Sequence, residues 1–202
     1  KYTIIKYKLL NSSYNLQNNT IEYTDTPTFD KIRKVLNIED VFDYLENTDI
    51  SKENFNKFIY ENYSPNDNCE RMYLTPENAL RIDFIRNKIE NWKNKELITI
   101  NEYYYLLASL IEGVPYVSNI TGTYGAYLKQ WDKRAFKKFE LIRLNVIDNK
   151  SNNKCYNRDA NELIKEIKGD ILYLDPPYNE RQYLPNYHLL ETIARYDNPE
   201  IK

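Results

Sequence analysis

Four consecutive residues, Asp175, Pro176, Pro177 and Tyr178, have the types and the order needed for chemistry on a planar amino group. They follow residues 171–174, a continuous apolar run that is typical of a strand covered on both faces. In open parallel sheets, ligands bind beyond the carboxyl ends of the strands, so the position itself indicates a site. The Asp175 carboxylate and the Pro176 carbonyl could accept both amino hydrogens, while Tyr178 stacks on the attached ring.

An amino group on an aromatic ring is a poor nucleophile because its lone pair is delocalised into the ring. Two acceptors aimed at its hydrogens would draw the nitrogen towards tetrahedral geometry. An anionic acceptor also stabilises the positive charge that grows on the nitrogen during group transfer. The motif therefore favours transfer of a group to such a nitrogen. The alternative interpretation is an extended turn, because prolines commonly end a strand and the Asp could cap a helix.

The composition bounds the kind of protein that carries this motif. The chain has 202 residues, of which 42% are hydrophobic and 29% charged, enough for one sizeable core or a core with a smaller lobe. The net charge of -2 argues against a uniformly basic nucleic-acid coat. Cys69 and Cys155 are too few for a disulfide framework or a Cys-rich zinc site. We expect no metal site, no membrane span and a reducing, cytoplasmic location.

Helix signals dominate the elements that must position the motif. Thr75, Pro76 and Glu77 form a strong helix start, and apolar residues follow them at helical spacing. Residues 54–73 lack periodicity and predict an irregular, flexible segment. The predicted helices cover residues 27–36, 41–46, 76–93, 100–111, 159–168 and 185–196.

The order of elements around the motif is helix, strand, loop, helix, which fits an α/β sheet with parallel strands. His188 is the sole histidine and lies on the last predicted helix. We expect it to pack or to cap a helix rather than to act as an acid or a base.

A resemblance to a known family rests on residues 169–183, which read Gly-Asp-Ile-Leu-Tyr-Leu-Asp-Pro-Pro-Tyr-Asn-Glu-Arg-Gln-Tyr. This segment looks like the catalytic region of adenine-specific DNA methyltransferases of the Dam-like group, and the resemblance extends over residues 103–131 and 186–190. It implies an α/β fold, with a partial Rossmann-like S-adenosylmethionine-dependent methyltransferase sheet and a mainly helical target-recognition lobe. The implied domains are residues 1–26 with 145–202 for catalysis and residues 27–144 for DNA binding.

The resemblance also implies roles for single residues. Asp175, Pro176 and Tyr178 would hold a flipped adenine, with Pro177 completing the catalytic motif. The implied cofactor is S-adenosylmethionine, which Asp175 would contact and whose adenine Asp159 would approach. Asp159 is interpreted equally well as the N-cap of the helix that it precedes.

Two features of that family are missing from these residues. The glycine-rich cofactor motif, aromatic-x-Gly-x-Gly, is absent among the four glycines. No acidic residue stands where one would bind the cofactor ribose, because residues 6–8 are Lys-Tyr-Lys. We therefore expect a fragment or truncated copy that starts beyond the first strand and that binds the cofactor poorly or not at all by itself.

A basic cluster in the middle of the chain favours contact with DNA phosphates. Asn119 and Tyr124, in the loop before this cluster, could contact bases or fill the gap left by a flipped one. The alternative for the cluster is an ordinary solvated helix face. The cluster holds two acids and six cations, an excess of four positive charges. The acids are Asp132 and Glu140, and the cations are Lys129, Lys133, Arg134, Lys137, Lys138 and Arg143.

The leading hypothesis is an enzyme that transfers a methyl group from S-adenosylmethionine to adenine N6 in double-stranded DNA. It would serve restriction-modification, alongside a cognate restriction endonuclease. The second hypothesis is a non-catalytic DNA-binding remnant, which would bind DNA but not the cofactor. The third is methylation of RNA or of a protein amide, because related motifs serve several planar nitrogens. The sequence leaves the oligomeric state open.

Overall fold

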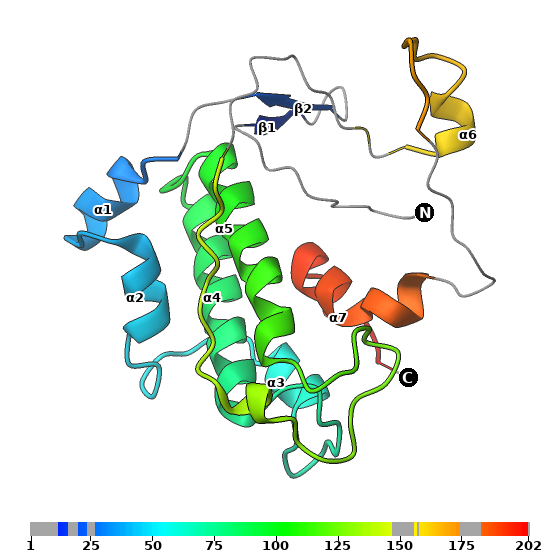
Figure 1. The fold of residues 1–202 in the computed structure, drawn as a ribbon. Coiled ribbons are helices and arrows are strands. Elements are labelled where there is room, and N and C mark those ends of the chain that lie inside the picture. Colours follow the sequence, from blue (N-terminus) through cyan, green and yellow to red (C-terminus); the bar gives the residue numbers. More distant parts are fainter. Residues whose placement is uncertain are drawn as a thin grey trace.

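The structure is a computed structural model that describes residues 12–15, 20–23, 27–146, 156, 158–173 and 183–201 (Figure 1). Two long helices, α4 and α5, lie side by side at its centre; α2 and α3 pack on α4, and α7 packs on α5. No helix within these ranges has the length and apolar content needed to cross a membrane. The elements are β1 (Ser12–Asn15), β2 (Thr20–Tyr23), α1 (Asp30–Leu36), α2 (Val41–Asn47), α3 (Phe58–Tyr63), α4 (Pro76–Asn94), α5 (Ile100–Gly113), η1 (Val114–Val117), η2 (Lys133–Phe136), α6 (Ala160–Leu163) and α7 (Tyr183–Arg195).

Helix α4 begins where its local sequence predicts. The Thr75 hydroxyl accepts a hydrogen bond from the Asn78 amide at 3.3 Å, and Pro76 occupies the first turn, where a missing N–H costs nothing. The apolar residues that follow at helical spacing are buried. The helix predicted over residues 76–93 is therefore confirmed.

Helix α5 begins with a reciprocal cap. The Thr99 hydroxyl accepts from the Glu102 amide at 3.2 Å, and the Glu102 carboxylate accepts from the Thr99 amide at 2.7 Å. The same carboxylate accepts from the Phe29 amide at 2.6 Å, which fixes the start of α1 against α5. The helix predicted over residues 100–111 is confirmed and extends two residues further.

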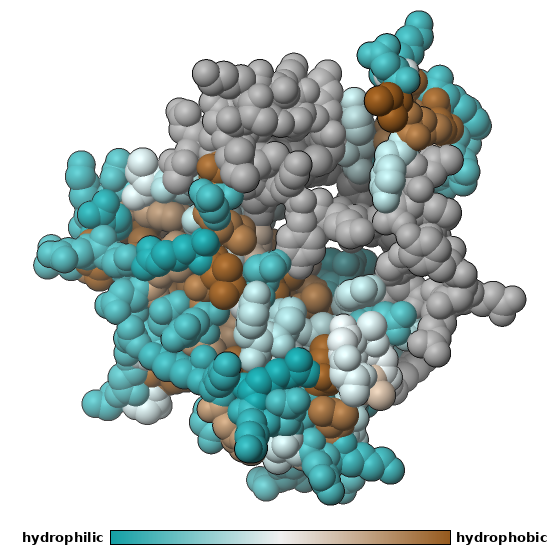
Figure 2. All heavy atoms as spheres, viewed as in Figure 1, coloured by the Kyte–Doolittle hydropathy of each residue, from teal (hydrophilic) through white to brown (hydrophobic). Residues whose placement is uncertain are grey.

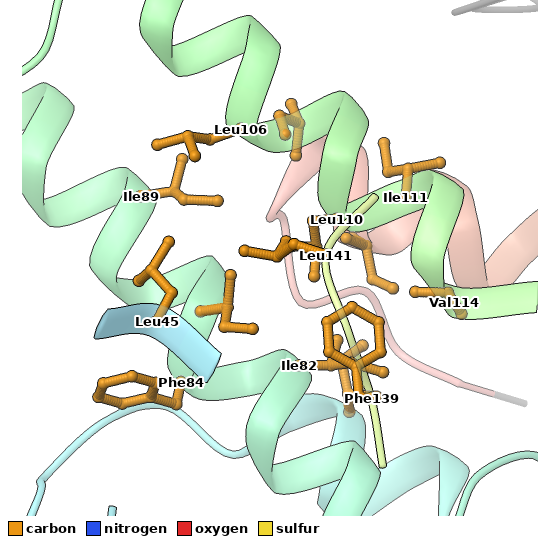
Figure 3. Packing of buried hydrophobic residues seen from close by; sticks show 14 of the residues in the cluster. Leu45, Ile82, Phe84, Ile89, Leu106, Leu110, Ile111, Val114, Phe139 and Leu141 are labelled. Atoms are coloured by element: carbon orange, nitrogen blue, oxygen red, sulfur yellow. The ribbon is translucent and has the colours of Figure 1, made fainter. Parts of the chain in front are cut away.

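The core lies where α4, α5 and α2 meet (Figure 3). Ile82 and Ile89 from α4, Leu106 and Leu110 from α5, and Leu45 from α2 are all completely buried. Fully burying a side chain of this size contributes roughly 1.5–3 kcal/mol. The helices thus hold one another through apolar contact, as expected for helices of 7 to 19 residues that are too short to be stable alone.

The segment after η2 crosses α5 and closes this core from one side (Figure 3). Phe139 is completely buried, and the Ile142 amide donates to the Ser109 carbonyl of α5 at 3.2 Å. Gly113 at the end of α5 makes the close approach possible, because a Cβ there would lie 2.4 Å from the Glu140 carbonyl oxygen. The crossing segment and α5 therefore require a residue without a side chain at this position.

Helix α7 packs on the same core. Its Leu189 and Ile193 are buried in the cluster that α4 and α5 form. The helix predicted over residues 185–196 is confirmed. The predicted domain division assigns α7 to the catalytic domain, because α7 lies beyond residue 144. In the structure, the apolar face of α7 lies in the core of the helical lobe.

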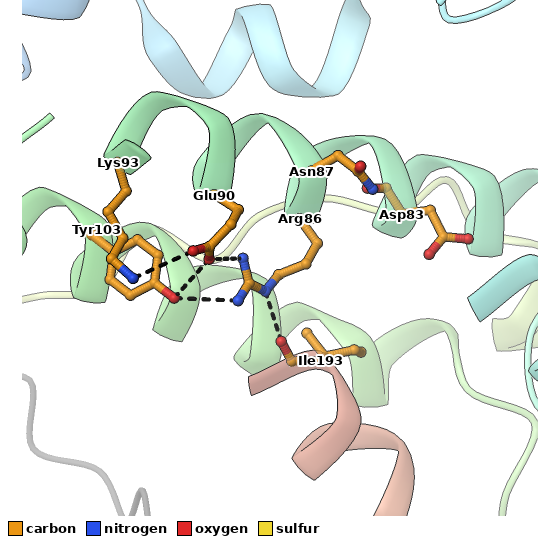
Figure 4. A network of polar contacts seen from close by, with 7 residues as sticks. All are labelled: Asp83, Arg86, Asn87, Glu90, Lys93, Tyr103 and Ile193. Carbon is orange, nitrogen blue, oxygen red and sulfur yellow. Dashed lines mark hydrogen bonds and ion pairs between the residues drawn. The ribbon is translucent and has the colours of Figure 1, made fainter. Parts of the chain in front are cut away.

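A buried arginine joins α7 to α4 (Figure 4). Arg86 is 2% exposed and donates through Nε to the Ile193 carbonyl at 2.7 Å, in the last turn of α7, where a cation complements the helix dipole. Its other nitrogens donate to Glu90 at 2.9 Å and to the Tyr103 hydroxyl at 3.2 Å. Burial alone would raise the pKa of Glu90, but the hydrogen bond and charge of Arg86 outweigh it and lower that pKa.

The segment expected to be irregular and flexible, residues 54–73, contains a helix and buried side chains. Helix α3 forms within it, and Ile59 and Tyr63 are buried. The cap of α3 comes from another helix, because the Asp83 carboxylate of α4 accepts from the amides of Ile59 (3.0 Å) and Tyr60 (2.8 Å). A cap that lies more than twenty residues away in the sequence leaves no local sequence pattern. For this reason the prediction of an irregular segment was wrong.

The parallel sheet expected around the motif is not visible in the described residues. The strands there are β1 and β2, an antiparallel pair with Ser12 opposite Tyr23 and Asn15 opposite Thr20. Residues 171–173, predicted to lie in a buried strand, are exposed and irregular. A strand buried on both faces needs neighbouring strands, and the described part of the chain places none beside them. The Rossmann-like sheet stays a prediction.

The helix predicted over residues 159–168 is shorter than expected. Only Ala160–Leu163 form α6, and the apolar residues meant for its buried face find no covering layer. Ile164 is 45% exposed, and apolar side chains gather on this segment at the upper right of Figure 2. Without a surface to pack on, a short amphipathic stretch gains little from remaining helical.

Candidate functional site

The motif formed by Asp175, Pro176, Pro177 and Tyr178 lies outside the described residues, and its catalytic role stays a prediction. The structure describes the helix that follows it, because α7 begins at Tyr183. The contacts of α7 therefore place the chain from Tyr183 onward.

His188 attaches α7 to the loop after η1. Its Nε2 lies 2.8 Å from the Tyr124 carbonyl oxygen, and its Nδ1 lies 3.0 Å from the Tyr63 hydroxyl. A carbonyl can only accept, so Nε2 carries the proton, and Nδ1 then accepts from the hydroxyl. Burial lowers the pKa of His188, which keeps the ring neutral. The expectation that this residue packs rather than acts as an acid or base agrees with these contacts.

Tyr124 lies in the interior beside this histidine. It is 2% exposed, its hydroxyl lies 3.1 Å from Ser118 Oγ, and its amide donates to the Asn186 carbonyl of α7 at 2.8 Å. The Tyr73 hydroxyl donates to the Tyr124 carbonyl at 3.1 Å. The loop and α7 are thus joined through the main-chain amide and carbonyl of Tyr124.

Asn119 is completely buried and organises the same loop. Its Nδ2 donates to the carbonyls of Met72 (3.0 Å) and Leu128 (2.8 Å), and its Oδ1 accepts from the Asp132 amide (2.9 Å). Base contact by Asn119 or Tyr124 stays a prediction, and it would require the side chain to leave these partners. Breaking one such buried bond costs on the order of 1–3 kcal/mol.

Asp159 caps helix α6. Its carboxylate accepts from the Asn161 amide at 2.8 Å, and the residue is exposed. The N-cap interpretation is confirmed, while contact with the cofactor stays a prediction. The described residues do not by themselves enclose a site for S-adenosylmethionine, because this carboxylate faces open surface and Asp175 lies outside them.

The basic cluster is not the face of a helix. Lys133–Phe136 form η2, a single 3-10 turn, and the residues after it are extended, so the alternative of a solvated helix face is wrong. Two of its arginines serve the fold: Arg134 donates to the Ile120 carbonyl, and Arg143 pairs with Asp40 at 2.7 Å. Lys138 is exposed and donates to the Asn47 side chain. The lysines of the cluster that are exposed and form neither an ion pair nor a side-chain hydrogen bond with another described residue are Lys129, Lys133 and Lys137.

Two residues that the sequence did not single out stand beside these lysines. The rings of Trp131 and Phe136 lie 5.7 Å apart, and Phe136 is 66% exposed. An aromatic residue next to a lysine run is the only sequence signal of this pair. The described residues contain no group of His, Cys, Asp and Glu that could hold a metal ion.

Comparison with curated proteins found relatives that match nearly the whole chain. The type II methyltransferase M.FokI of Planomicrobium okeanokoites is 54% identical over 99% of this chain and 31% of the relative. The modification methylase StsI of Streptococcus sanguinis is 46% identical over 100% of the chain and 30% of the relative. The modification methylase LlaI of Lactococcus lactis subsp. lactis is 43% identical over 100% of the chain and 32% of the relative.

The chain thus spans about a third of the length of these three relatives. No solved structure matches it significantly. The model of the D12 class N6 adenine-specific DNA methyltransferases matches residues 3–202, which include the Asp-Pro-Pro-Tyr motif. The chain belongs to the D12 class N6 adenine-specific DNA methyltransferase family.

Proposed function

We propose that the protein transfers a methyl group from S-adenosylmethionine to N6 of adenine in double-stranded DNA, as the modification enzyme of a restriction-modification system. The match of the family model over residues 3–202 carries this proposal. The names of the relatives, a type II methyltransferase at 54% identity and two modification methylases at 46% and 43%, support the restriction-modification context. A cognate restriction endonuclease would act on the same DNA, and both enzymes would work in the cytoplasm.

In the proposed reaction, the motif holds the target amino group. The Asp175 carboxylate and the Pro176 carbonyl accept its two hydrogens, and Tyr178 stacks on a base that has left the duplex. The negative charge of Asp175 stabilises the nitrogen as it becomes positive, so its effect is larger in the transition state than in the ground state. Pro177, which has no N–H, restricts the direction of the Pro176 carbonyl.

S-adenosylmethionine supplies the methyl group. On this chain we assign its contacts to Asp175 and Asp159. Asp159 keeps acceptor capacity beyond its single bond to the Asn161 amide, because an ionised carboxylate offers about four lone-pair sites. The donor set needed to enclose the rest of the cofactor does not lie in the described residues.

The helical lobe, residues 27–144 together with α7, serves DNA recognition in this proposal. Lys129, Lys133 and Lys137 are exposed cations that fit phosphate contacts. Arg134 acts differently, because it holds the loop that precedes them. Asn119 and Tyr124 likewise support the position of that loop from the interior.

Replacing Asp175 with Ala in the full-length protein tests the proposal. We expect methyl transfer to duplex DNA, measured with labelled S-adenosylmethionine, to fall roughly 100-fold or more because the anionic acceptor is lost. The control is Asp170→Ala, which removes an exposed carboxylate five residues earlier and should leave activity unchanged. Full activity of the Asp175→Ala variant contradicts the assignment.

A substrate panel separates the proposal from its alternatives. Duplex DNA should be labelled, whereas RNA and protein should not. A non-catalytic remnant would bind the DNA and show no heat with S-adenosylmethionine in calorimetry. Labelling of RNA or protein in preference to DNA would replace the proposed substrate.

A further inference from the structure

A groove of about 790 Å³ lies between the first turn of α4 and the segment that contains η2. Thr75, Pro76 and Asn78 line it from α4. Trp131, Phe136, Lys137 and Lys138 line it from the other side. The sequence analysis assigned some of these lysines to DNA but did not identify the groove or its aromatic wall.

The aromatic wall is exposed where apolar rings would normally be buried. Phe136 is 66% exposed, although Ala135 beside it and Phe139 after it are completely buried. Trp131 lies against it at 5.7 Å with the ring planes inclined by 53°. The exposed face of the Phe136 ring at the groove edge, supported by Trp131, offers an apolar contact of the kind that nucleic-acid bases stack on.

The backbone that carries this wall is fixed from below. The Asn78 Nδ2 donates to the carbonyls of Ala135 (3.0 Å) and Lys137 (2.9 Å), and its Oδ1 accepts from the Phe139 amide (2.9 Å). Asn78 is 5% exposed, so these three bonds are shielded from water. The side chains of residues 136 and 137 are therefore presented from a rigid frame, which lowers the entropy lost on binding.

Cations flank the rings. Lys137 and Lys138 line the groove, and Lys133 lies beside it in η2, three residues before Phe136. Lys133 and Lys137 are exposed and form no ion pair with a described residue, whereas Lys138 donates to the Asn47 side chain. Glu77 is an exposed acid on the rim, and Asp132 lies near Arg134 at 3.8 Å. The free charge at the groove is therefore positive and favours an anionic occupant over an apolar protein segment.

We propose that this groove and the adjoining η2 turn form a DNA contact site, in which Lys133 and Lys137 bind backbone phosphates and Phe136, supported by Trp131, stacks on a base that has left the duplex stack. The inference rests on the proposed function, because a base that leaves its stack opens the neighbouring step. It adds an aromatic contact on the recognition lobe, separate from the motif that holds the target adenine.

The test measures the binding of the full-length protein to a labelled duplex of mixed sequence by fluorescence anisotropy between 50 and 300 mM salt. Each phosphate contact contributes about 0.9 to the slope of log affinity against log salt. The double variant Lys133→Gln, Lys137→Gln should lower this slope by about 1.8 and weaken binding about tenfold or more at 100 mM salt. The matched control is Lys95→Gln, at the far end of α4, which should change neither.

Stacking is tested separately. Phe136→Ala should weaken binding about 5- to 100-fold with the salt slope unchanged, and Phe136→Tyr should restore it. DNA should also quench the fluorescence of Trp131, and this quenching should be absent in the variant Trp131→Phe. Trp92, the other tryptophan of the chain, is 3% exposed and should be quenched little. Circular dichroism identifies any variant that fails to fold.

The groove proposal is overturned if the lysine double variant and Phe136→Ala both bind DNA with the affinity and the salt slope of Lys95→Gln. If the unaltered protein also methylates duplex DNA, the proposed function stands and only the groove assignment fails. If the unaltered protein neither binds nor methylates duplex DNA, the proposed function fails and the groove proposal fails with it.

Discussion

At the scale of single residues, two polar side chains of types that often contact substrates, those of His188 and Asn119, instead stabilise the fold. His188 is the sole histidine, yet both ring nitrogens are occupied by Tyr63 and the Tyr124 carbonyl, and Tyr63 stacks on its ring at 5.3 Å. Asn119 shows the same pattern, with its amide saturated by the backbone. Polar residues so engaged are poor candidates for contact with a substrate.

The neutral state of His188 predicts a pH dependence of stability. Burial lowers its pKa from an ordinary value of 6.5, and nearby Arg71 lowers it further. Because the unfolded chain then binds the proton more readily, the stabilisation is complete above about pH 6.5 and is lost as the pH falls below it. In His188→Gln, which keeps a donor and an acceptor but does not titrate, the loss of unfolding free energy between pH 7 and pH 5 should be smaller.

Urea unfolding at the two pH values measures this difference. Comparing the variant with the unaltered protein cancels the contributions of other titrating groups, Asp83 included. An equal loss in both proteins would show that folding does not lower the pKa of His188.

At the scale of elements, the helices divide by the origin of their caps. Thr75 and Thr99 cap α4 and α5 from the adjacent residue, and both helices were predicted from the sequence. Helix α3 has no side-chain cap at its own N-cap position and takes two acceptors from Asp83 of α4 instead. Burial raises the pKa of Asp83 to about 8, although the two amide donors act in the opposite direction.

Removal of this remote cap should melt α3 first. We expect Asp83→Ala to lower the free energy of unfolding by about 2–4 kcal/mol, because two buried amides lose their acceptor. Asp43→Ala, which removes an exposed carboxylate from α2, should cost less than about 0.5 kcal/mol. Urea unfolding gives both values, and hydrogen exchange at Ile59 and Tyr60 should accelerate only in the first variant.

At the scale of the whole molecule, α7, the first described element after the motif, packs on the helical lobe. Leu189 and Ile193 complete the core, and Arg86 closes the far end of the helix by binding the Ile193 carbonyl. The contacts of His188 and Asn186 hold the near end. The helix that begins at Tyr183 is therefore packed on the lobe assigned to recognition.

The arginine is the residue on which this docking depends. Arg86→Met keeps much of the volume but leaves Glu90 without its buried cation, so we expect a loss of about 3 kcal/mol in the free energy of unfolding. Arg195→Met, on the exposed side of α7, should change it by less than about 0.5 kcal/mol. Thermal or urea unfolding measures both, and equal losses would indicate that the Arg86 network contributes no more than a surface pair.

What the sequence determined by itself is local. The Asp175 to Tyr178 motif predicts its chemistry through residue type and order. The helix predicted at 76–93 follows from an adjacent cap and helical spacing, and that at 100–111 from helical spacing. Such signals act over one or two turns, so no distant partner is needed to interpret them.

Tertiary structure decided what depends on distant partners. Asp83 caps a helix that begins 25 residues earlier, and Gly113 is required by a crossing segment. Arg134 donates to the Ile120 carbonyl and Arg143 pairs with Asp40, so both arginines are engaged within the chain. A side chain's role is set by the groups that surround it after folding, and these contacts join residues that lie far apart in the chain. This is why the motif could be recognised from the sequence, whereas the groove at Phe136 required the fold.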